Sequence, residues 1–296
     1  MLRCVIILLE LTFIASLDLA KGNAAEPVNN NALRNTRPGT VRVDNEIKMK
    51  FVWCPAGTFL MGSSKSEEEP FSMCRPKQVR VVVTHGFWIA QTEVTEAQWI
   101  GIMATEPWKR EELDQENVPH GPMIPAHGVE QDRALEFCSQ LTRRERSAGR
   151  ISDSFEYTLP TEAEWEYACR AGTTTKYGFG DDLNELNEYG WTAMNTRAAS
   201  EMTPHGVAQK KPNPWGIYDM HGNVHEWCVD VFHPKLPGGT DPIVTIRNDE
   251  YNGGVFRGGS WNAITESGER NGHFSPECFD SEIGFRPVLV RSRMPK

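Results

Sequence analysis

The sequence predicts an α+β fold, in which strands and helices occupy separate stretches of one domain. Alternating apolar residues before residue 95 predict strands, and three later stretches carry helix-start signals or an apolar stripe. After Gly172 the chain is rich in Gly, Pro, Asn and Trp, which favours loops joined by short strands. The composition never shifts enough to mark a second boundary, so we expect a single domain over residues 46–296.

The first 25 residues have the pattern of an export signal. Arg3 gives a positive start, residues 4–17 are mostly apolar, and small residues follow at 22–25. A buried first helix is the alternative. No later run approaches the roughly 18 to 20 apolar residues that a membrane span needs. We therefore expect a signal peptide at 1–25, a polar flexible leader at 26–45, and an exported, periplasmic or extracellular, protein without a membrane span.

The strand signals lie between the leader and the first helix. The stretch MKFVWCPAGTFLMGSS, residues 49–64, places two apolar runs around a Pro-Ala-Gly turn, which predicts a β-hairpin. The period-two pattern of QVRVVVTHGFWIAQTEVT, residues 78–95, predicts further strands. Later, GVFRGGSW and IGFRPVLV predict short strands near the end of the chain.

Three helices are predicted from local signals. Thr95 with Gln98, and Thr161 with Glu164, have the spacing of capping boxes, in which the two residues satisfy each other's free backbone N–H groups. Gly172 stands where the last helix is expected to end. Between these two helices, one face of a third carries an apolar stripe at i, i+3, i+4 and i+7, made of Ala134, Phe137, Cys138 and Leu141.

Charge and cysteine content limit the function classes. With 31 Lys and Arg against 40 Asp and Glu, the net charge is −9, which disfavours nucleic acid as a partner because such binding needs a basic surface. The mature chain keeps an even number of cysteines, which permits disulfides in an exported protein but does not fix their pairing. Buried free thiols are the alternative. These cysteines are Cys54, Cys74, Cys138, Cys169, Cys228 and Cys278.

The stretch YDMHGNVHEWCVD, residues 218–230, has the composition of a metal site. His221 and His225 are four residues apart, and on a helix they would share a face and bind zinc with Cys228 or a carboxylate. However, Gly222-Asn223 lies between them and favours a turn, which removes that geometry. The remaining histidines show no ligand spacing and are expected to be ordinary side chains: His85, His120, His127, His205, His233 and His273.

Calcium is the second interpretation of the same stretch. Calcium prefers oxygen ligands from carboxylates and from main-chain carbonyls on turns. Asp219 and Glu226 supply carboxylates, and the intervening turn can direct carbonyl groups toward an ion. A solvated acidic turn without an ion is the alternative, and the spacing alone does not decide between the two.

Six blocks occur in the order typical of one family: FVWCPAGTFLMGSS, FWIAQTEVTEAQW, LPTEAEWEYACRAGT, NPWGIYDMHGNVHEWCVD, FRGGSWN and IGFRP. With these blocks the chain, from Phe51 to Val290, resembles the formylglycine-generating enzyme family, also called the sulfatase-modifying-factor family. The resemblance implies that family's variant of the C-type-lectin-like fold, with little regular secondary structure.

The resemblance also implies an activity and marks a departure from it. Active members oxidise a sulfatase cysteine to formylglycine with oxygen and a copper ion that two cysteines hold. Those thiol positions fall on Ala263 and Gly268 here, and neither residue binds Cu(I), so the sequence predicts no copper site and no catalytic residue. Ser260 matches an active-site serine of the family, and we take Arg257, Ser260 and Trp261 as candidates for a substrate groove.

For the metal, the resemblance implies a structural calcium ion. Its ligands, carried over by position, are the side chains of Asp219 and Glu226 and the main-chain oxygens of Gly222 and Val224. The family's other calcium site has no clear match in residues 189–216, so we expect it to be absent.

The family disulfides find no partners here. Cys138 and Cys169 match two family cysteines whose partners fall near His273 and on Pro287, so both are expected to be free thiols. A bridge between Cys278 and another cysteine stays open.

Three functions follow from these patterns. The first is a binding or interaction module for a peptide, protein or glycan, because the scaffold is intact while the reactive thiols are missing. The second is a formylglycine-generating oxidase that acts on a sulfatase cysteine despite their absence. The third resembles the iron-dependent sulfoxide synthases, whose separate helical three-histidine domain is longer than the segment before residue 46.

Overall fold

The computed structural model describes residues 36–63, 75–113, 118–247, 252–274 and 280–293. The expected signal peptide at 1–25 lies outside these residues. In the described part of the chain, no helix is long and apolar enough to cross a membrane.

The central element is a five-stranded antiparallel sheet in the order β1-β2-β5-β12-β6. It joins strands from both ends of the chain, since β12 pairs with β5 on one side and β6 on the other. Its strands are β1 (Val41–Arg42), β2 (Phe51–Cys54), β5 (Phe87–Ala90), β6 (Phe155–Thr158) and β12 (Val288–Arg291).

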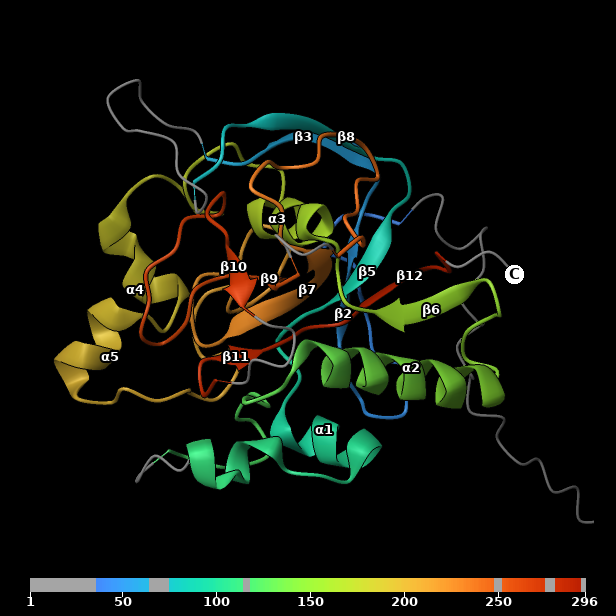
Figure 1. Ribbon diagram of the computed structural model, residues 1–296, viewed down its shortest axis with the longest axis horizontal. Helices are drawn as coiled ribbons and strands as arrows, with labels where there is room; N and C mark the ends of the chain where they lie inside the picture. Colours follow the sequence, from blue (N-terminus) through green and yellow to red (C-terminus); the bar gives the residue numbers. More distant parts are fainter. Residues whose placement is uncertain (1–35, 64–74, 114–117, 248–251, 275–279, 294–296) are drawn as a thin grey trace, which may run out of the picture.

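Two smaller sheets flank the central one (Figure 1). The four-stranded sheet has the order β10-β9-β7-β11, with only β7 and β11 parallel; its strands are β7 (His225–Val231), β9 (Gly254–Arg257), β10 (Asn271–Phe274) and β11 (Ile283–Gly284). The three-stranded sheet has the order β3-β4-β8, with β4 and β8 parallel; its strands are β3 (Gly57–Met61), β4 (Val79–Val83) and β8 (Gly239–Thr240).

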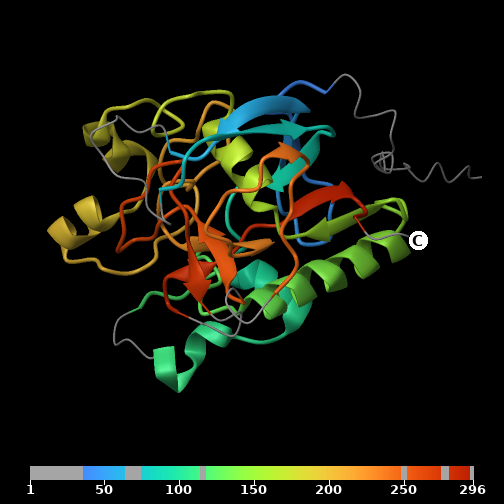
Figure 2. The same cartoon turned by 45° about the horizontal axis from the view of Figure 1, so that its top comes forward.

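The helices surround these sheets, with α1 and α2 on one side and α4 and α5 at one end, as the two views in Figures 1 and 2 show. The α-helices are α1 (Glu96–Met103), α2 (Gln131–Ser147), α3 (Glu162–Arg170), α4 (Leu186–Tyr189) and α5 (Ala193–Ala199). Short 3₁₀ turns are η1 (Pro107–Lys109), η2 (Glu111–Leu113) and η3 (Leu183–Glu185).

The predicted helix starts are confirmed. The capping boxes at Thr95 and Thr161 form as expected, and the four stripe residues of α2 are all buried. Helix α3 ends at Arg170. Its C-cap Ala171 takes the left-handed conformation at φ 47°, and Gly172 follows directly after the cap at φ 88°, as predicted for a glycine that ends a helix.

Strand β2 separates two apolar cores. Phe51 and Trp53 point into the core beneath α1 and α2, while Val52 and Cys54 point into the core beneath α3, as the period of two in a strand requires. Both faces of the central sheet are therefore covered, and the sheet forms the middle layer of the domain.

Two predictions about the first strands are wrong. Strands β2 and β3 are consecutive but do not form a hairpin: β2 pairs with β1 and β5, and β3 pairs with β4 in another sheet. Val41–Arg42 pairs with Phe51 and Val52, so the ordered domain begins inside the expected leader at 26–45. A third strand, β1, occupies the edge of β2 that a hairpin would have used.

Candidate functional site

The turn before β7 brings the expected calcium ligands into the interior. Asp219 and Asn223 have φ 60° and 67°, in the left-handed region that these two residue types tolerate best after glycine. At Gly222, with φ 154°, a Cβ atom would lie 2.2 Å from Trp191 O, so only glycine fits. The turn predicted at Gly222-Asn223 is confirmed, and the chain then enters the seven-residue strand β7, which sequence patterns did not indicate.

The two histidines of this stretch have separate environments. His221 Nε2 accepts a hydrogen bond from Gly178 N at 3.1 Å, whereas the His225 ring packs on Phe256 with centroids 4.8 Å apart. Burial lowers the pKa of each imidazole to about 4, so both are neutral. Among the described residues, no group of three metal-ligating side chains includes either histidine, so the zinc interpretation of this stretch is not supported.

Glu226 is held by an arginine. Both of its oxygens accept a hydrogen bond from Arg286, each at 2.6 Å, and Oε2 also accepts one from Trp165 Nε1 at 2.7 Å. All three side chains are buried, so the pair is an internal ion pair of the kind that is strongly destabilising to break. The Glu226 side chain is therefore a poor calcium ligand, because a cation would have to displace a guanidinium.

Asp219 and Glu93 supply the carboxylate oxygens that remain. Asp219 Oδ2 accepts from Ala208 N, but Asp219 Oδ1 and both oxygens of Glu93 are buried without a hydrogen-bond partner. Burial raises the pKa of Asp219 to about 6, and burial followed by the charge of Asp219 raises the pKa of Glu93 well above its usual range. These three carboxyl oxygens fit a hard cation or a proton shared between the two side chains, and sequence reasoning missed Glu93 because it lies more than a hundred residues away.

Arg257, a groove candidate, is a core residue. It is 0% exposed, and its guanidinium donates to Glu162 Oε1 at 3.2 Å, to Glu166 Oε2 at 2.5 Å and to Ser267 O at 2.9 Å. Burial alone would lower the pKa of Arg257, but the two glutamates of α3 raise it overall. The side chain of Arg257 does not reach a surface in this structure, because α3 covers it and neutralises its charge, and its place in a substrate groove stays a prediction.

The other two groove candidates are also covered. Ser260 is 0% exposed, donates to Glu282 and accepts from Asn262 N at 3.1 Å. Trp261 is 4% exposed, and its indole N–H has no partner. Neither side chain reaches a surface in this structure, so their place in a ligand groove stays a prediction.

The two positions that the resemblance assigns to thiols have different surroundings. Ala263 is half-buried, but Gly268 lies against the backbone of a distant loop. A Cβ atom at 268 would lie 2.4 Å from Gly62 O and 2.8 Å from Ser63 N, closer than real Cβ contacts. Position 268 therefore excludes every side chain, cysteine included, in this backbone arrangement.

Residues 39–291 match the family described as "Sulfatase-modifying factor enzyme 1-like domain". The chain belongs to this family.

Relatives of this sulfatase-modifying-factor domain differ in how much of it they share. Chaperone protein LppX of Paenibacillus barcinonensis is 28% identical over 247 residues, which span 72% of this chain and 82% of LppX. The formylglycine-generating enzyme of Streptomyces coelicolor is 29% identical over 171 residues, but the match covers only 50% of that enzyme. The structure of Treponema denticola variable protein 1 superposes with a TM-score of 0.65 at 27% identity, covering 82% of this chain and 96% of that one. The predicted fold class is thereby confirmed.

The described cysteines of the sulfatase-modifying-factor domain are free thiols. Cys54, Cys138, Cys169 and Cys228 are all buried and unpaired, which confirms the prediction for Cys138 and Cys169. Cys74 and Cys278 lie outside the described residues, so a bridge from Cys278 stays a prediction.

A second group of titratable residues lies at the start of α1. Glu96, His120 and His127 place one potential ligand atom each within 4.8 Å of the others. Sequence reasoning treated both histidines as ordinary side chains, because they are seven residues apart on a loop and their carboxylate partner lies on another element.

Proposed function

We propose that this domain is an exported binding or interaction module that lacks the copper-dependent cysteine oxidase activity of its family. One observation carries the proposal: the backbone of Gly62 occupies the space that a side chain at position 268, the second thiol position, would need. Cu(I) is stabilised by soft thiolate ligands, and the described cysteines are buried at other positions. Without a pair of thiols, the family's oxidation chemistry has no site for its metal.

The names of two relatives support a non-enzymatic role. LppX, which this chain matches over most of its length, is named a chaperone protein, and the Treponema structure is named a variable protein. Neither name denotes an oxidase. A fold of this kind can keep its scaffold while its loops serve other purposes.

A surface pocket of about 780 Å³ is the best candidate for a binding site, because ligand sites commonly have volumes of this order. Its lining is largely apolar, with Phe87 and Ile243 among the lining residues, and charged residues such as Glu156 and Arg291 also line it. An apolar surface with charges of both signs suits an extended peptide better than a glycan. We take a peptide segment of a client protein as the ligand class.

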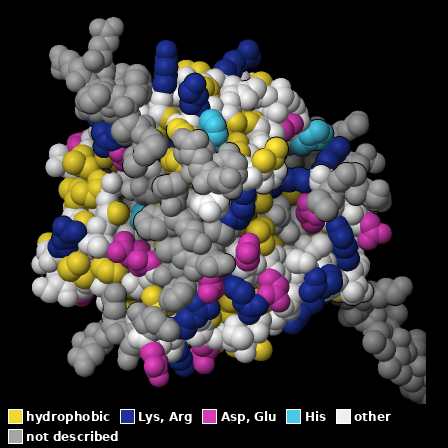
Figure 3. Space-filling view, viewed as in Figure 1, with side chains coloured by type: hydrophobic (Ala, Val, Ile, Leu, Met, Phe, Trp, Pro, Cys, Tyr) yellow, Lys and Arg dark blue, Asp and Glu magenta, His cyan; other side chains and the backbone are white. Residues whose placement is uncertain are grey.

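The face of the molecule shown in Figure 3 does not favour nucleic acid. On the face shown in Figure 3, Lys and Arg side chains are interspersed with Asp and Glu, and small apolar patches lie between them. A partner is therefore expected to be recognised by shape and apolar contact, not by its phosphates.

Oxidation and binding are tested separately. The purified protein, loaded with copper under oxygen, is incubated with a Cys-x-Pro-x-Arg peptide, with the Streptomyces coelicolor enzyme as the positive control. We expect the peptide mass to stay unchanged. A mass loss matching conversion of the thiol to an aldehyde would support the alternative, a formylglycine-generating oxidase.

Binding is tested by selection from a displayed random peptide library. Ile243 lines the pocket and is 41% exposed, whereas Ile246 is 81% exposed and lies outside it. We expect enriched peptides to lose binding to Ile243→Asp and to keep it with Ile246→Asp. Equal loss with both variants, or no enrichment with the wild type, contradicts a peptide site in this pocket.

We further propose a structural calcium ion beside Asp219 and Glu93, in place of the Glu226 ligand expected from the sequence. The three buried, unpartnered carboxyl oxygens support it. If it binds, calcium raises the melting temperature above that in chelator, and Asp219→Asn removes the difference. No difference in the wild type would favour a protonated carboxyl pair instead.

Export is proposed on the pattern of residues 1–25. Sequencing the N-terminus of the protein recovered from its native cells tests it: a start near residue 26 supports cleavage, and a start at Met1 argues against it.

A further inference from the structure

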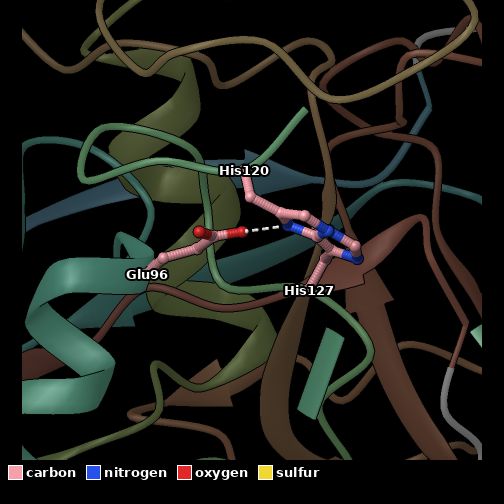
Figure 4. A group of neighbouring side chains, drawn as sticks. All are labelled: Glu96, His120 and His127. Carbon is pink, nitrogen blue, oxygen red and sulfur yellow. Dashed lines mark hydrogen bonds and ion pairs between the residues drawn. The ribbon is translucent and has the colours of Figure 1, made fainter. Parts of the chain in front are cut away.

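Two loop histidines meet a helix glutamate because hydrogen bonds fasten the loop to the start of α1. Glu96 N donates to Ile124 O at 2.8 Å, and Ala126 N donates to Val94 O at 2.8 Å. These bonds bring the loop that carries His120 and His127 alongside Glu96, as Figure 4 shows. The arrangement of the three side chains therefore depends on the backbone of the loop.

His127 is a buried side chain without a hydrogen-bond partner. The residue is 1% exposed, and neither ring nitrogen bonds to any described group. Leaving a buried polar atom without a hydrogen bond is unfavourable, so a histidine in the core is normally bonded through at least one nitrogen. Burial, followed by the neighbouring His120, lowers the pKa of His127 to about 4, which leaves a neutral imidazole with a free lone pair.

The other two side chains complete a set of nitrogen and oxygen donors. Glu96 is 4% exposed, and its Oε1 lies 2.9 Å from His120 Nδ1, while its Oε2 accepts from Gly121 N at 2.9 Å. The rings of His120 and His127 are nearly parallel, at 6°, with centroids 6.3 Å apart. The carboxylate is thus held in position by the loop, and both imidazoles lie on the same side of it (Figure 4).

We propose that Glu96, His120 and His127 bind a divalent first-row transition-metal ion. Bond lengths near 2.0–2.1 Å place two ligand atoms of a tetrahedral site about 3.3 Å apart, so atoms already within 4.8 Å need only small side-chain rotations. The ion would satisfy His127, which is otherwise unpaired. Two imidazoles and one carboxylate leave at least one coordination position open.

The donor set selects the class of metal. Calcium and magnesium prefer oxygen, and Cu(I) prefers thiolate, so two imidazoles with one carboxylate suit Zn²⁺, Co²⁺ or Fe²⁺. The His120 side chain is 40% exposed, and it borders a surface pocket of about 170 Å³ that η1 and η2 also line. An ion can therefore enter from solvent, and the open position is reachable by water or a small ligand. Its three side chains differ from Asp219 and Glu93, which carry the calcium proposal, and from the thiol positions at 263 and 268.

Cobalt titration of the metal-stripped protein tests the proposal, with calcium present in excess to occupy any oxygen site. We expect one Co²⁺ per chain, a visible d–d absorption band, and displacement of that band by one equivalent of Zn²⁺. His120→Ala removes an exposed ligand, and Glu96→Gln keeps the size of the third side chain; each should weaken binding by about 100-fold or more.

His85→Ala is the matched control, because His85 is an exposed histidine outside the cluster. It should bind cobalt like the wild type. Circular dichroism of each variant shows whether it is folded, and Glu96→Gln and His120→Ala provide two independent tests. The proposal is overturned if the wild type binds no stoichiometric cobalt, or if both ligand variants bind it as tightly as the wild type.

Discussion

Substituting Gly268 with alanine tests most directly whether the backbone at Gly62 excludes a side chain at position 268. Gly268 has no left-handed backbone angle, so the substitution adds one methyl group without backbone strain of its own. That methyl carbon would lie 2.4 Å from Gly62 O. Since C···O contacts lie at about 3.3 Å, relief requires the two segments to separate by about 0.9 Å.

Several bonds resist that separation. Gly62 N donates to Glu166 Oε1 at 2.8 Å, and Gly62 O accepts from Arg170 Nη2 at 2.9 Å. Glu166 is itself buried and paired with both Arg170 and Arg257. Overpacking costs about 1–3 kcal/mol. Weakening a hydrogen bond to a charged group adds about 1.5–3 kcal/mol. We expect Gly268→Ala to lower the free energy of unfolding by about 3–5 kcal/mol.

Equilibrium unfolding in urea measures this change, and a thermal melt should show a fall of about 10 °C for a domain of this size. Gly101→Ala is the control: Gly101 lies in α1, its nearest neighbour would be 3.8 Å from the new Cβ, and alanine there should stabilise by about 0.5–1 kcal/mol. If Gly268→Ala is as stable as the wild type, the Gly62 loop yields freely and position 268 could accept a cysteine.

Three further predictions concern the interior. Glu226→Gln should destabilise by about 3–5 kcal/mol in urea unfolding because it leaves Arg286 buried without its charge partner, and adding Arg286→Met should restore part of the loss. The four described cysteines should stay unlabelled by maleimide in the native protein, as mapped by peptide mass spectrometry, because burial raises the pKa of each thiol; labelling without denaturant would contradict their burial. Burial, followed by Glu162, raises the pKa of Asp230 to about 7, so the folded state holds this proton between about pH 4 and 7 while the unfolded state releases it. Stability should therefore fall as pH rises through that window, and the fall should be shallower in Asp230→Asn; equal pH slopes of the urea midpoint would refute this.

Sequence patterns predicted the elements whose signals are local. The capping boxes at Thr95 and Thr161 join residues three apart, and the stripe of α2 lies within eight residues, so a short stretch of sequence is enough to predict each feature. Pairing between strands has no such local cause. The hairpin expected at Pro55 fails because β1 and β5 occupy both edges of β2, and that outcome depends on segments outside the pattern.

The predictions about the candidate sites also depended on whether the cause was local in the sequence. The turn at Gly222 was predictable because glycine and asparagine act locally, but the partner of Glu226 is an arginine sixty positions later in the chain. His120 and His127, the two histidines proposed as metal ligands, lie beside Glu96 only because hydrogen bonds fasten their loop to the start of α1. Position 268 could be recognised from the resemblance as lacking a thiol, yet only the structure shows that Gly62 closes it.

The scaffold explains how the fold persists without the oxidase thiols. Arg257, from the Arg-Gly-Gly-Ser block, bonds to α3 and to Ser267 O, and α3 in turn holds Gly62 through Glu166. Every contact in this chain of bonds is made by a guanidinium, a carboxylate or a backbone group, and none needs a sulfur atom. The block therefore has a structural role in joining α3 to the loop at Gly62, and that role keeps position 268 against the same loop. The arrangement that stabilises the domain also excludes a side chain at position 268, so the proposed loss of copper chemistry and the stability of the fold would have one physical cause.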